Sequence, residues 1–388
     1  MSRALHNYLK DSVPGTPFFI YDMGLLKDTL SELHKASKPG DYKIHYALKA
    51  NSNREILELI AASGLGADCV SGPEIERAME TGFTASKIAF AGVGKTDEEI
   101  LTGLGAGIFS FNCESAEEIK VISELAGREG KVAPIALRIN PNVNANTHKY
   151  ITTGLEENKF GINPWEFDAV CEVIKNSGNV SLKGLHFHIG SQINDLEPFR
   201  NLCLRANEMW SFFSGKGFEL NHLNLGGGLG IDYQDPDANP IPGFTAFFDT
   251  FRKFLYTVPG REVHFELGRS IVGQCGTLVS RVVFVKKGIN THFIILDAGM
   301  TELIRPALYQ SIHKIENYSA VASGRKNENE VKYDVVGPIC ESSDCFGKAL
   351  TLPETFRNDI ILIRSAGAYG EVMSSAYNLR KKAPAYYF

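Results

Sequence analysis

Short apolar runs alternate with amphipathic stretches along this 388-residue chain, up to about residue 268. The amphipathic stretches have helical periodicity, for example at residues 53–63, 73–81, 115–127, 164–176 and 198–213. The apolar runs are candidate strands, at residues 42–47, 67–70, 88–91, 108–111, 134–139, 182–188, 220–225 and 263–266. Eight such repeats of strand and helix predict an α/β fold of the TIM type, a (β/α)8 barrel.

Beyond the predicted barrel the helical patterns thin out. Strand-like runs dominate there, at residues 280–285, 293–296, 333–336 and 360–363, so we expect a mostly β C-terminal domain. We expect the early run at residues 17–21 to join this β domain, because chain termini often lie close together. The predicted domains are a barrel of residues 24–265 and a β domain of residues 1–23 and 266–388.

The composition favours a protein that acts on a small molecule. A net charge of -5 without a basic run gives no electrostatic footprint for nucleic acid or for an anionic membrane. There is no window of about 18 apolar residues and no apolar signal segment, so we expect a cytoplasmic protein. The seven cysteines are scattered without a Cys-x-x-Cys pair, which predicts reduced thiols, no disulfide framework and no metal site.

Lys49 follows the first predicted barrel strand, and the active sites of such barrels gather where strands end. An ammonium at the tip of a buried strand is costly unless it is paired or used covalently. Lysine forms Schiff bases, so Lys49 is the first candidate to hold pyridoxal phosphate. Taken alone, such a lysine is more often an ordinary snorkelling side chain.

Two histidines, His186 and His188, lie at the end of the sixth run, and Ser191 follows them. An isolated histidine on a strand is most often a satisfied core residue. Binding of a metal would need further ligands, and none is found nearby in the sequence. We favour a third interpretation, in which His188 stacks on an aromatic cofactor and Ser191 donates a hydrogen bond to the phosphate of that cofactor.

A glycine-rich segment at residues 224–231 follows the seventh run. The backbone amides of Gly226, Gly227 and Gly228 can close on an anion, and the loops after strands 7 and 8 are the usual phosphate site of a TIM barrel. The segment is not a dinucleotide fingerprint, because Ile231 occupies the sixth position of that pattern. A flexible turn remains the alternative.

The eighth run ends in Glu266, followed by Gly268 and Arg269. A salt bridge between the two charged residues is one interpretation. The functional interpretation assigns Glu266 to a pyridine nitrogen and Arg269 to a phosphate or carboxylate. The β domain adds four polar segments at residues 305–309, 337–344, 367–370 and 377–378, and each taken singly is as often structural as functional.

In this order, the segments from Lys49 to Tyr377 resemble the fold-type III pyridoxal-phosphate decarboxylases, which are alanine-racemase-like, and most closely their diaminopimelate decarboxylase branch. The resemblance implies that Lys49 carries the cofactor, that His188 stacks on its ring and that Glu266 faces its pyridine nitrogen. It also implies a set of residues around the phosphate and the rest of the cofactor, namely Ser191, Gly226, Gly227, Gly228, Gly268, Arg269 and Tyr369. One departure is Leu267, where the family often has proline.

The resemblance likewise implies the residues around the substrate, which are Arg269, Arg305, Tyr309, Glu341 and Tyr369. Cys340 is similar to the proton donor of the family, which the partner subunit of a homodimer supplies to a shared active site. The implied activity is decarboxylation of meso-2,6-diaminopimelate to L-lysine and carbon dioxide, the last step of bacterial lysine biosynthesis.

Charge argues for this substrate, since its second amino-acid head needs a cation for the distal carboxylate and an anion for the distal ammonium. Arg305, Tyr309 and Glu341 supply both. A polyamine-pathway decarboxylase of the ornithine, arginine or carboxynorspermidine type ranks second, because Arg305 would there be buried without a partner. An amino-acid racemase is disfavoured by Glu266, and a non-catalytic carrier of pyridoxal phosphate would lack the β domain.

Overall fold

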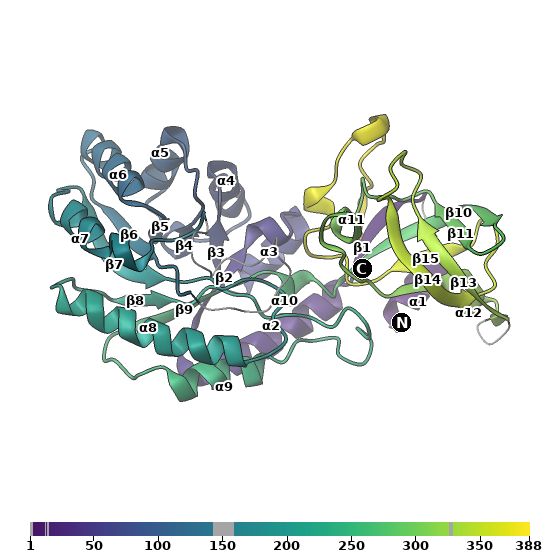
Figure 1. Cartoon of the computed structure of the whole chain (residues 1–388), viewed down its shortest axis with the longest axis horizontal. Coiled ribbons are helices and arrows are strands. Elements are labelled where there is room, and N and C mark those ends of the chain that lie inside the picture. The colour runs from purple at the N-terminus through teal and green to yellow at the C-terminus, as the bar shows by residue number, and fades with distance from the viewer. Residues whose placement is uncertain (1–2, 12, 14, 143–158, 326–328) are drawn as a thin grey trace. The chain divides into compact units, whose positions relative to one another are not determined.

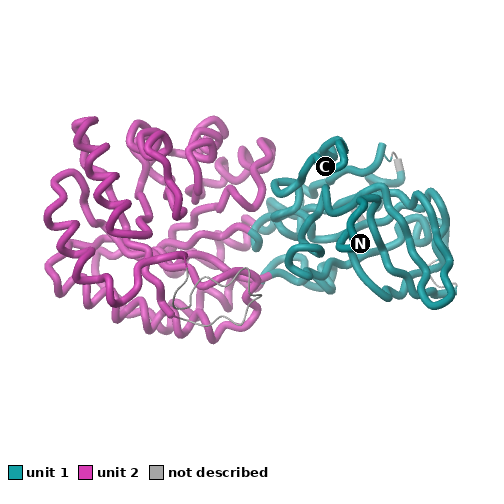
Figure 2. The backbone as a smooth tube through the Cα atoms, turned by 45° about the horizontal axis from the view of Figure 1, so that its top comes forward, with its two compact units in different colours: residues 1–29, 231–242, 269–388 teal, residues 30–230, 243–268 magenta. Residues whose placement is uncertain are grey.

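The computed structural model describes residues 3–11, 13, 15–142, 159–325 and 329–388 (Figure 1). The chain forms two compact units (Figure 2). Unit 1 comprises Met1–Thr29, Ile231–Pro242 and Arg269–Phe388, and unit 2 comprises Leu30–Gly230 and Gly243–Gly268. The segment Ile231–Pro242 therefore belongs to unit 1, although in the sequence it lies between two stretches of unit 2. The assignment of a cofactor-binding domain to residues 24–265 stays a prediction.

Unit 2 contains a closed parallel barrel, which confirms the predicted (β/α)8 fold. Its strands, in order around the barrel, are β2 (Lys43–Ala47), β3 (Gly66–Cys69), β4 (Ile88–Phe90), β5 (Ser110–Cys113), β6 (Ala133–Arg138), β7 (Val180–His186), β8 (His222–Asn224) and β9 (Glu262–Leu267). Most of their residues are buried, as parallel strands covered on both faces require. Each corresponds to one predicted run, although β5 begins two residues later than expected and β7 ends two residues earlier.

The helices of the barrel region alternate with the strands along the chain, and α2 precedes the first barrel strand (Figure 1). They are α2 (Met23–Ser37), α3 (Arg54–Ala62), α4 (Gly72–Glu80), α5 (Asp97–Ala106), α6 (Ala116–Arg128), α7 (Phe167–Lys175), α8 (Glu197–Gly215) and α9 (Phe244–Phe254). Short 3-10 turns add η1 (Lys38–Gly40), η2 (Leu48–Ala50), η3 (Ala85–Lys87) and η4 (Pro164–Glu166). No helix within the described part of the chain has both the length and the apolar character that a bilayer crossing requires.

Three of these helices, α2, α5 and α9, have no counterpart among the expected ones. α5 starts with a capping box, in which Thr96 and Glu99 satisfy each other's backbone N–H groups, but glycines within it weaken the helical pattern. α9 buries an apolar face made of Phe244, Phe247, Phe248 and Phe251. The capping residues of α5 and the apolar face of α9 can both be read from the sequence. The aromatic residues of α9 have the i, i+3, i+4, i+7 spacing of an amphipathic helix.

Unit 1 is built on an eight-stranded mixed sheet with the order β12-β15-β10-β11-β13-β14, and β1 joins β10 to β16. The bounds are β1 (Phe18–Tyr21), β10 (Gly276–Lys287), β11 (His292–Leu296), β12 (Ile315–Asn317), β13 (Glu330–Val336), β14 (Cys345–Pro353), β15 (Ile360–Ile363) and β16 (Ala385–Tyr387). Short helices are α1 (Arg3–Asp11), α10 (Arg269–Val272), α11 (Arg305–Tyr309), α12 (Tyr318–Ala322), η6 (Glu371–Met373) and η7 (Tyr377–Leu379). The predicted β domain is confirmed.

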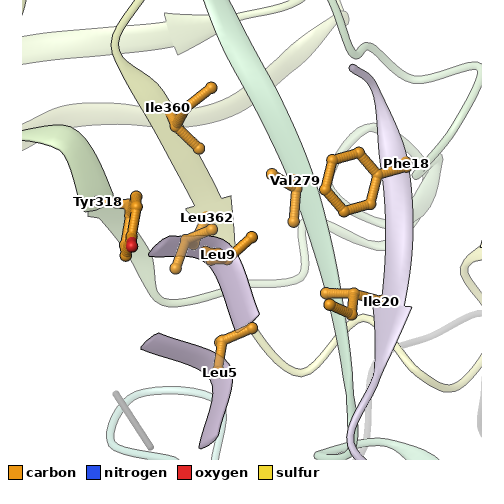
Figure 3. Close-up of a cluster of buried hydrophobic side chains, with 8 residues drawn as sticks. All are labelled: Leu5, Leu9, Phe18, Ile20, Val279, Tyr318, Ile360 and Leu362. Carbon is orange, nitrogen blue, oxygen red and sulfur yellow. The ribbon is translucent and has the colours of Figure 1, made fainter. Parts of the chain in front are cut away.

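A buried hydrophobic cluster fixes the N-terminal elements to this sheet (Figure 3). α1 contributes Leu5 and Leu9, one turn apart, and β1 contributes Phe18 and Ile20 from one face of the strand. The remaining members come from β10, α12 and β15 and are Val279, Tyr318, Ile360 and Leu362. Most of the early run at residues 17–21 forms β1, which pairs with β10 of this sheet.

Candidate active site

Lys49 lies directly after the first barrel strand, in η2. Its Nζ is 3.1 Å from Oδ2 of Asp68, a completely buried residue of β3. The parallel register of β2 and β3 places Ala47 opposite Asp68, so the lysine and the carboxylate come together where two neighbouring strands end. An ion pair with a buried carboxylate offsets the desolvation of an ammonium in such a place.

Asp68 is not among the residues expected from the sequence. The available signal is a lone carboxylate inside the short buried strand β3. Burial and the neighbouring Glu266 raise the pKa of Asp68 above its usual range, although Lys49 opposes this shift. Its second oxygen, Oδ1, is buried and has no hydrogen-bond partner among the described residues. That oxygen can accept a hydrogen bond from a bound ligand.

The carboxylate of Glu266, in β9, receives hydrogen-bond donors from three other strands of the barrel. Nε2 of His186, at the end of β7, is 2.9 Å from Oε2. The side-chain amides of Asn112 in β5 and Asn224 in β8 donate to Oε1 at 3.2 Å and 2.7 Å. Because these strands belong to one closed barrel, their side chains converge in its interior.

These contacts decide the charge of Glu266. Burial alone would raise its pKa, but the interactions with His186, Lys49 and His188 hold the pKa of this carboxyl well below its usual range. Glu266 is thus an anion over the whole physiological pH range. A fixed buried anion stabilises a proton on a ring nitrogen placed next to it.

Asn224 links Glu266 to the glycine-rich loop after β8. Its Oδ1 accepts a hydrogen bond from the backbone N–H of Gly226 at 2.9 Å, while its amide nitrogen donates to Glu266. Gly226 and Gly228 have φ values of 65° and 111°, in the region that favours glycine. A Cβ atom at Gly227 would overlap the carbonyl oxygen of Glu266. The loop therefore needs glycine both for its backbone shape and for its packing against the exit of β9.

His188 lies in the loop beyond β7, because that strand ends two residues before it. Its Nδ1 is 3.5 Å from the backbone nitrogen of Gly227. Burial, with the nearby cations Arg138 and Lys49, lowers the pKa of His188 to about 3. The ring is therefore neutral at physiological pH, and a neutral ring can stack on an aromatic ligand. Ser191 follows in the same loop and is half-buried.

In unit 1, Tyr233 holds two arginines that come from different helices. Its hydroxyl oxygen accepts hydrogen bonds from Nη1 of Arg269 at 2.6 Å and from Nη1 of Arg305 at 2.7 Å. Arg269 is the first residue of α10 and Arg305 the first of α11, and both are buried. Burial lowers the pKa of Arg305, and Arg269 contributes to this shift while Tyr233 opposes it.

Arg305 lacks a counter-ion in this arrangement. Within the part of the chain that the structure describes, no carboxylate forms an ion pair with it, and its buried Nε has no hydrogen-bond partner. Two buried guanidiniums that share one neutral oxygen repel each other, and a bound anion would relieve this repulsion. The pair is therefore suited to a carboxylate or a phosphate.

Two predicted tyrosines lie near these arginines in the fold of unit 1. The ring of Tyr369 is 4.9 Å from the guanidinium carbon of Arg269, a cation–π contact. Tyr309 is the last residue of α11, one helical turn after Arg305, and it is half-buried. Arg269, Arg305 and Tyr369 are therefore brought together, and Tyr233 is the residue in their midst that the sequence motifs do not include.

Cys340 and Glu341 lie in an exposed loop whose shape depends on buried Asp344. Oδ2 of Asp344 accepts a hydrogen bond from the backbone N–H of Ile339 at 2.7 Å. Glu341 accepts a hydrogen bond from the hydroxyl of Tyr377 at 2.9 Å, and it forms neither a hydrogen bond nor an ion pair with an arginine of its own described chain. The loop thus presents a thiol and a carboxylate to solvent on a fixed backbone.

The barrel residues fit pyridoxal phosphate by their chemistry. Lys49 offers an amine for the cofactor's carbonyl carbon, Glu266 a charged carboxylate for its ring nitrogen, and His188 a neutral ring for its face. The orphaned buried Oδ1 of Asp68 leaves one further acceptor for a ligand. The glycine-rich loop follows the seventh barrel strand, where TIM barrels bind phosphate.

Comparison with known proteins agrees with this fit to pyridoxal phosphate. The model of the family described as "Pyridoxal-dependent decarboxylase, pyridoxal binding domain" matches residues 24–273. Diaminopimelate decarboxylase of Bacteroides thetaiotaomicron is 52% identical over 372 residues, which are 96% of this chain and 95% of that protein. Diaminopimelate decarboxylase of Aquifex aeolicus is 39% identical over 95% of this chain and 86% of that protein.

A solved structure is similar over nearly the whole chain. It is the diaminopimelate decarboxylase of Helicobacter pylori complexed with L-lysine, with a TM-score of 0.90 and 38% sequence identity. The likeness covers 99% of this chain and 94% of that chain. The fold and the order of the elements therefore agree between the two proteins.

Proposed function

The chain belongs to the pyridoxal-dependent decarboxylases, among which its relatives are diaminopimelate decarboxylases, and we propose that it converts meso-2,6-diaminopimelate to L-lysine and carbon dioxide. It is then a carboxy-lyase of lysine biosynthesis. The observation that carries the choice of substrate is the buried pair Arg269 and Arg305, because a substrate with two amino-acid heads brings a second carboxylate that needs cationic partners.

The cofactor is pyridoxal phosphate, which when bound supplies an electron-poor ring that takes up the electrons left by departing carbon dioxide. We propose that Lys49 binds it covalently and that Asp68 pairs with the amine of Lys49 whenever that amine is released. Glu266, kept anionic in the barrel, holds a proton on the ring nitrogen. His188 stacks on the ring. The remaining cofactor contacts are Ser191, Gly226, Gly227, Gly228, Gly268, Arg269 and Tyr369.

For the substrate, we propose that Arg305 and Tyr309 bind the distal carboxylate and that Glu341 binds the distal ammonium. Arg269 and Tyr369 lie beside the same ligand. Cys340 returns a proton to the carbon that has lost its carboxylate, as a general acid. A thiol can do this only when the substrate lies within hydrogen-bond reach.

We also propose a homodimer in which Cys340 and Glu341 serve the site of the partner subunit. Both side chains are exposed in a single chain, although a general acid works best where water is excluded. A second copy of the chain would cover them. The seven cysteines are all free thiols, which suits the cytoplasmic location that we propose.

The variant Arg305→Ala tests the choice of substrate. We expect turnover of meso-diaminopimelate to fall about 10- to 150-fold, since a charge-assisted hydrogen bond contributes about 1.5 to 3 kcal/mol. Retention of the cofactor after dialysis, read from visible absorbance, should not change. The matched control is Arg357→Ala, because Arg357 is an exposed arginine of the same unit.

Steady-state kinetics of both variants on meso-diaminopimelate and on ornithine test whether Arg305 determines the choice of substrate. Unchanged kinetics in Arg305→Ala would contradict the assignment. Equal activity of the wild type on ornithine would favour the polyamine-type alternative.

A further inference from the structure

Tyr233 uses its full capacity as a hydrogen-bond acceptor on two arginines. A phenolic oxygen has two lone pairs and one hydrogen. Nη1 of Arg269 at 2.6 Å and Nη1 of Arg305 at 2.7 Å occupy both lone pairs. Neither guanidinium can accept the hydroxyl hydrogen, so this hydrogen is directed to a third group, which must be an acceptor.

The ring of Tyr233 is held in place independently of any ligand. His313 packs edge-on against it, with ring centroids 5.0 Å apart and an interplanar angle of 78°. Nδ1 of His313 is 2.8 Å from the carbonyl oxygen of Arg364, next to β15, and a carbonyl can only accept, so Nδ1 carries the hydrogen. Burial and the neighbouring Arg305 lower the pKa of His313 to about 3, which keeps this support neutral.

The two arginines come from different helices and lie far apart in the sequence. Arg269 is 36 residues and Arg305 is 72 residues from Tyr233. The ring of Tyr233 also lies 5.1 Å from the guanidinium carbon of Arg305. The oxygen of Tyr233 therefore holds the two guanidiniums close together, although like charges repel.

We infer that Tyr233 is a positioning residue that aligns Arg269 and Arg305 as a clamp for one carboxylate, the one that diaminopimelate retains when it becomes lysine. This rests on the proposed function. Two guanidiniums aligned in advance lose less side-chain freedom on binding than two independent arginines, and the phenolic hydroxyl adds a third donor. A ligand without that carboxylate gains nothing from the clamp.

The variant Tyr233→Phe removes the shared oxygen and keeps the ring. L-Lysine and cadaverine are the probes, because they differ only in the carboxylate. Titration calorimetry on the cofactor-loaded enzyme should show that lysine affinity falls about 10-fold or more, while cadaverine affinity stays within about twofold. KM for meso-diaminopimelate should rise by a factor similar to the loss of lysine affinity, with kcat little changed.

The matched control is Tyr333→Phe, which removes another buried tyrosine hydroxyl in the same unit, one that accepts a hydrogen bond from the backbone of Thr355. It should change neither ligand affinity. If Tyr233→Phe folds poorly, Tyr233→His keeps a ring with one acceptor atom but cannot accept from both arginines at once. It should separate lysine from cadaverine in the same way.

Several outcomes would overturn the inference. Equal weakening of lysine and cadaverine would make Tyr233 a general structural support. A fall in kcat with unchanged KM would assign it to the chemistry, and a loss of bound cofactor would assign the clamp to the phosphate. If the wild type converts diaminopimelate and Tyr233→Phe behaves like it, this inference alone fails. If the wild type forms no lysine from diaminopimelate, the proposed function itself fails.

Discussion

The purified protein should absorb visible light at about 420 nm, and Lys49→Ala should lose both this absorbance and the cofactor adduct that borohydride fixes to the chain. Lys49 lies just after β2 with a buried carboxylate 3.1 Å away, so its amine is placed at the barrel mouth. Without that amine no covalent attachment is possible. Decarboxylation should therefore fall below detection, because the product can no longer be released by exchange with the lysine.

The control for this variant is Lys43→Ala, at the first residue of β2, the strand that precedes Lys49. Lys43 pairs with Asp41 at the surface, so its loss should leave absorbance and adduct unchanged. Mass spectrometry of the borohydride-treated proteins reads the adduct directly. A cofactor that is still fixed covalently in Lys49→Ala would contradict the assignment of this residue.

The second large effect concerns Cys340. If it is the general acid, Cys340→Ala should lower turnover about 100- to 10,000-fold. If it serves the partner's site, mixing Cys340→Ala with Lys49→Ala should restore activity. With free exchange of equal amounts, about half of the dimers are mixed and each has one intact site, so recovery should approach about a quarter of wild-type activity.

A mixture of wild type with the double variant Lys49→Ala/Cys340→Ala is the matched control. Its mixed dimers have no intact site when sites are shared, so activity should fall to about a quarter of the undiluted wild type at equal total protein. If each chain completed its own site, the activity would stay at about half. Failure of the two single variants to complement after verified exchange would likewise exclude shared sites.

The sequence predicts the architecture well because the barrel repeats a local pattern. Each predicted barrel strand corresponds to an observed one, since a short buried strand needs only a continuous apolar run. β12 and β14 lack such a run. β14 lies at the edge of the sheet and its residues are mostly half-buried or exposed, so nothing in its composition marks it as a strand.

Only part of the candidate site can be predicted from the sequence. Lys49 and Glu266 can be found, because each lies at or just after the end of a predicted strand, where the active sites of such barrels gather. Asp68, Asn112 and Tyr233 cannot be found in this way. The contact of Asp68 with Lys49 depends on the register of β2 and β3, and the contact of Asn112 with Glu266 depends on closure of the barrel. Such relations between distant residues have no local pattern.

The measurement that tests the central claim most directly is product analysis with the cofactor-loaded wild type. Incubated with meso-diaminopimelate, the enzyme should release equal amounts of L-lysine and carbon dioxide, and it should release far less carbon dioxide from ornithine or arginine. Conversion of meso-diaminopimelate to a stereoisomer without release of carbon dioxide would show a racemase. Carbon dioxide from ornithine but not from diaminopimelate would show a polyamine-type decarboxylase, and either result would contradict the proposed function.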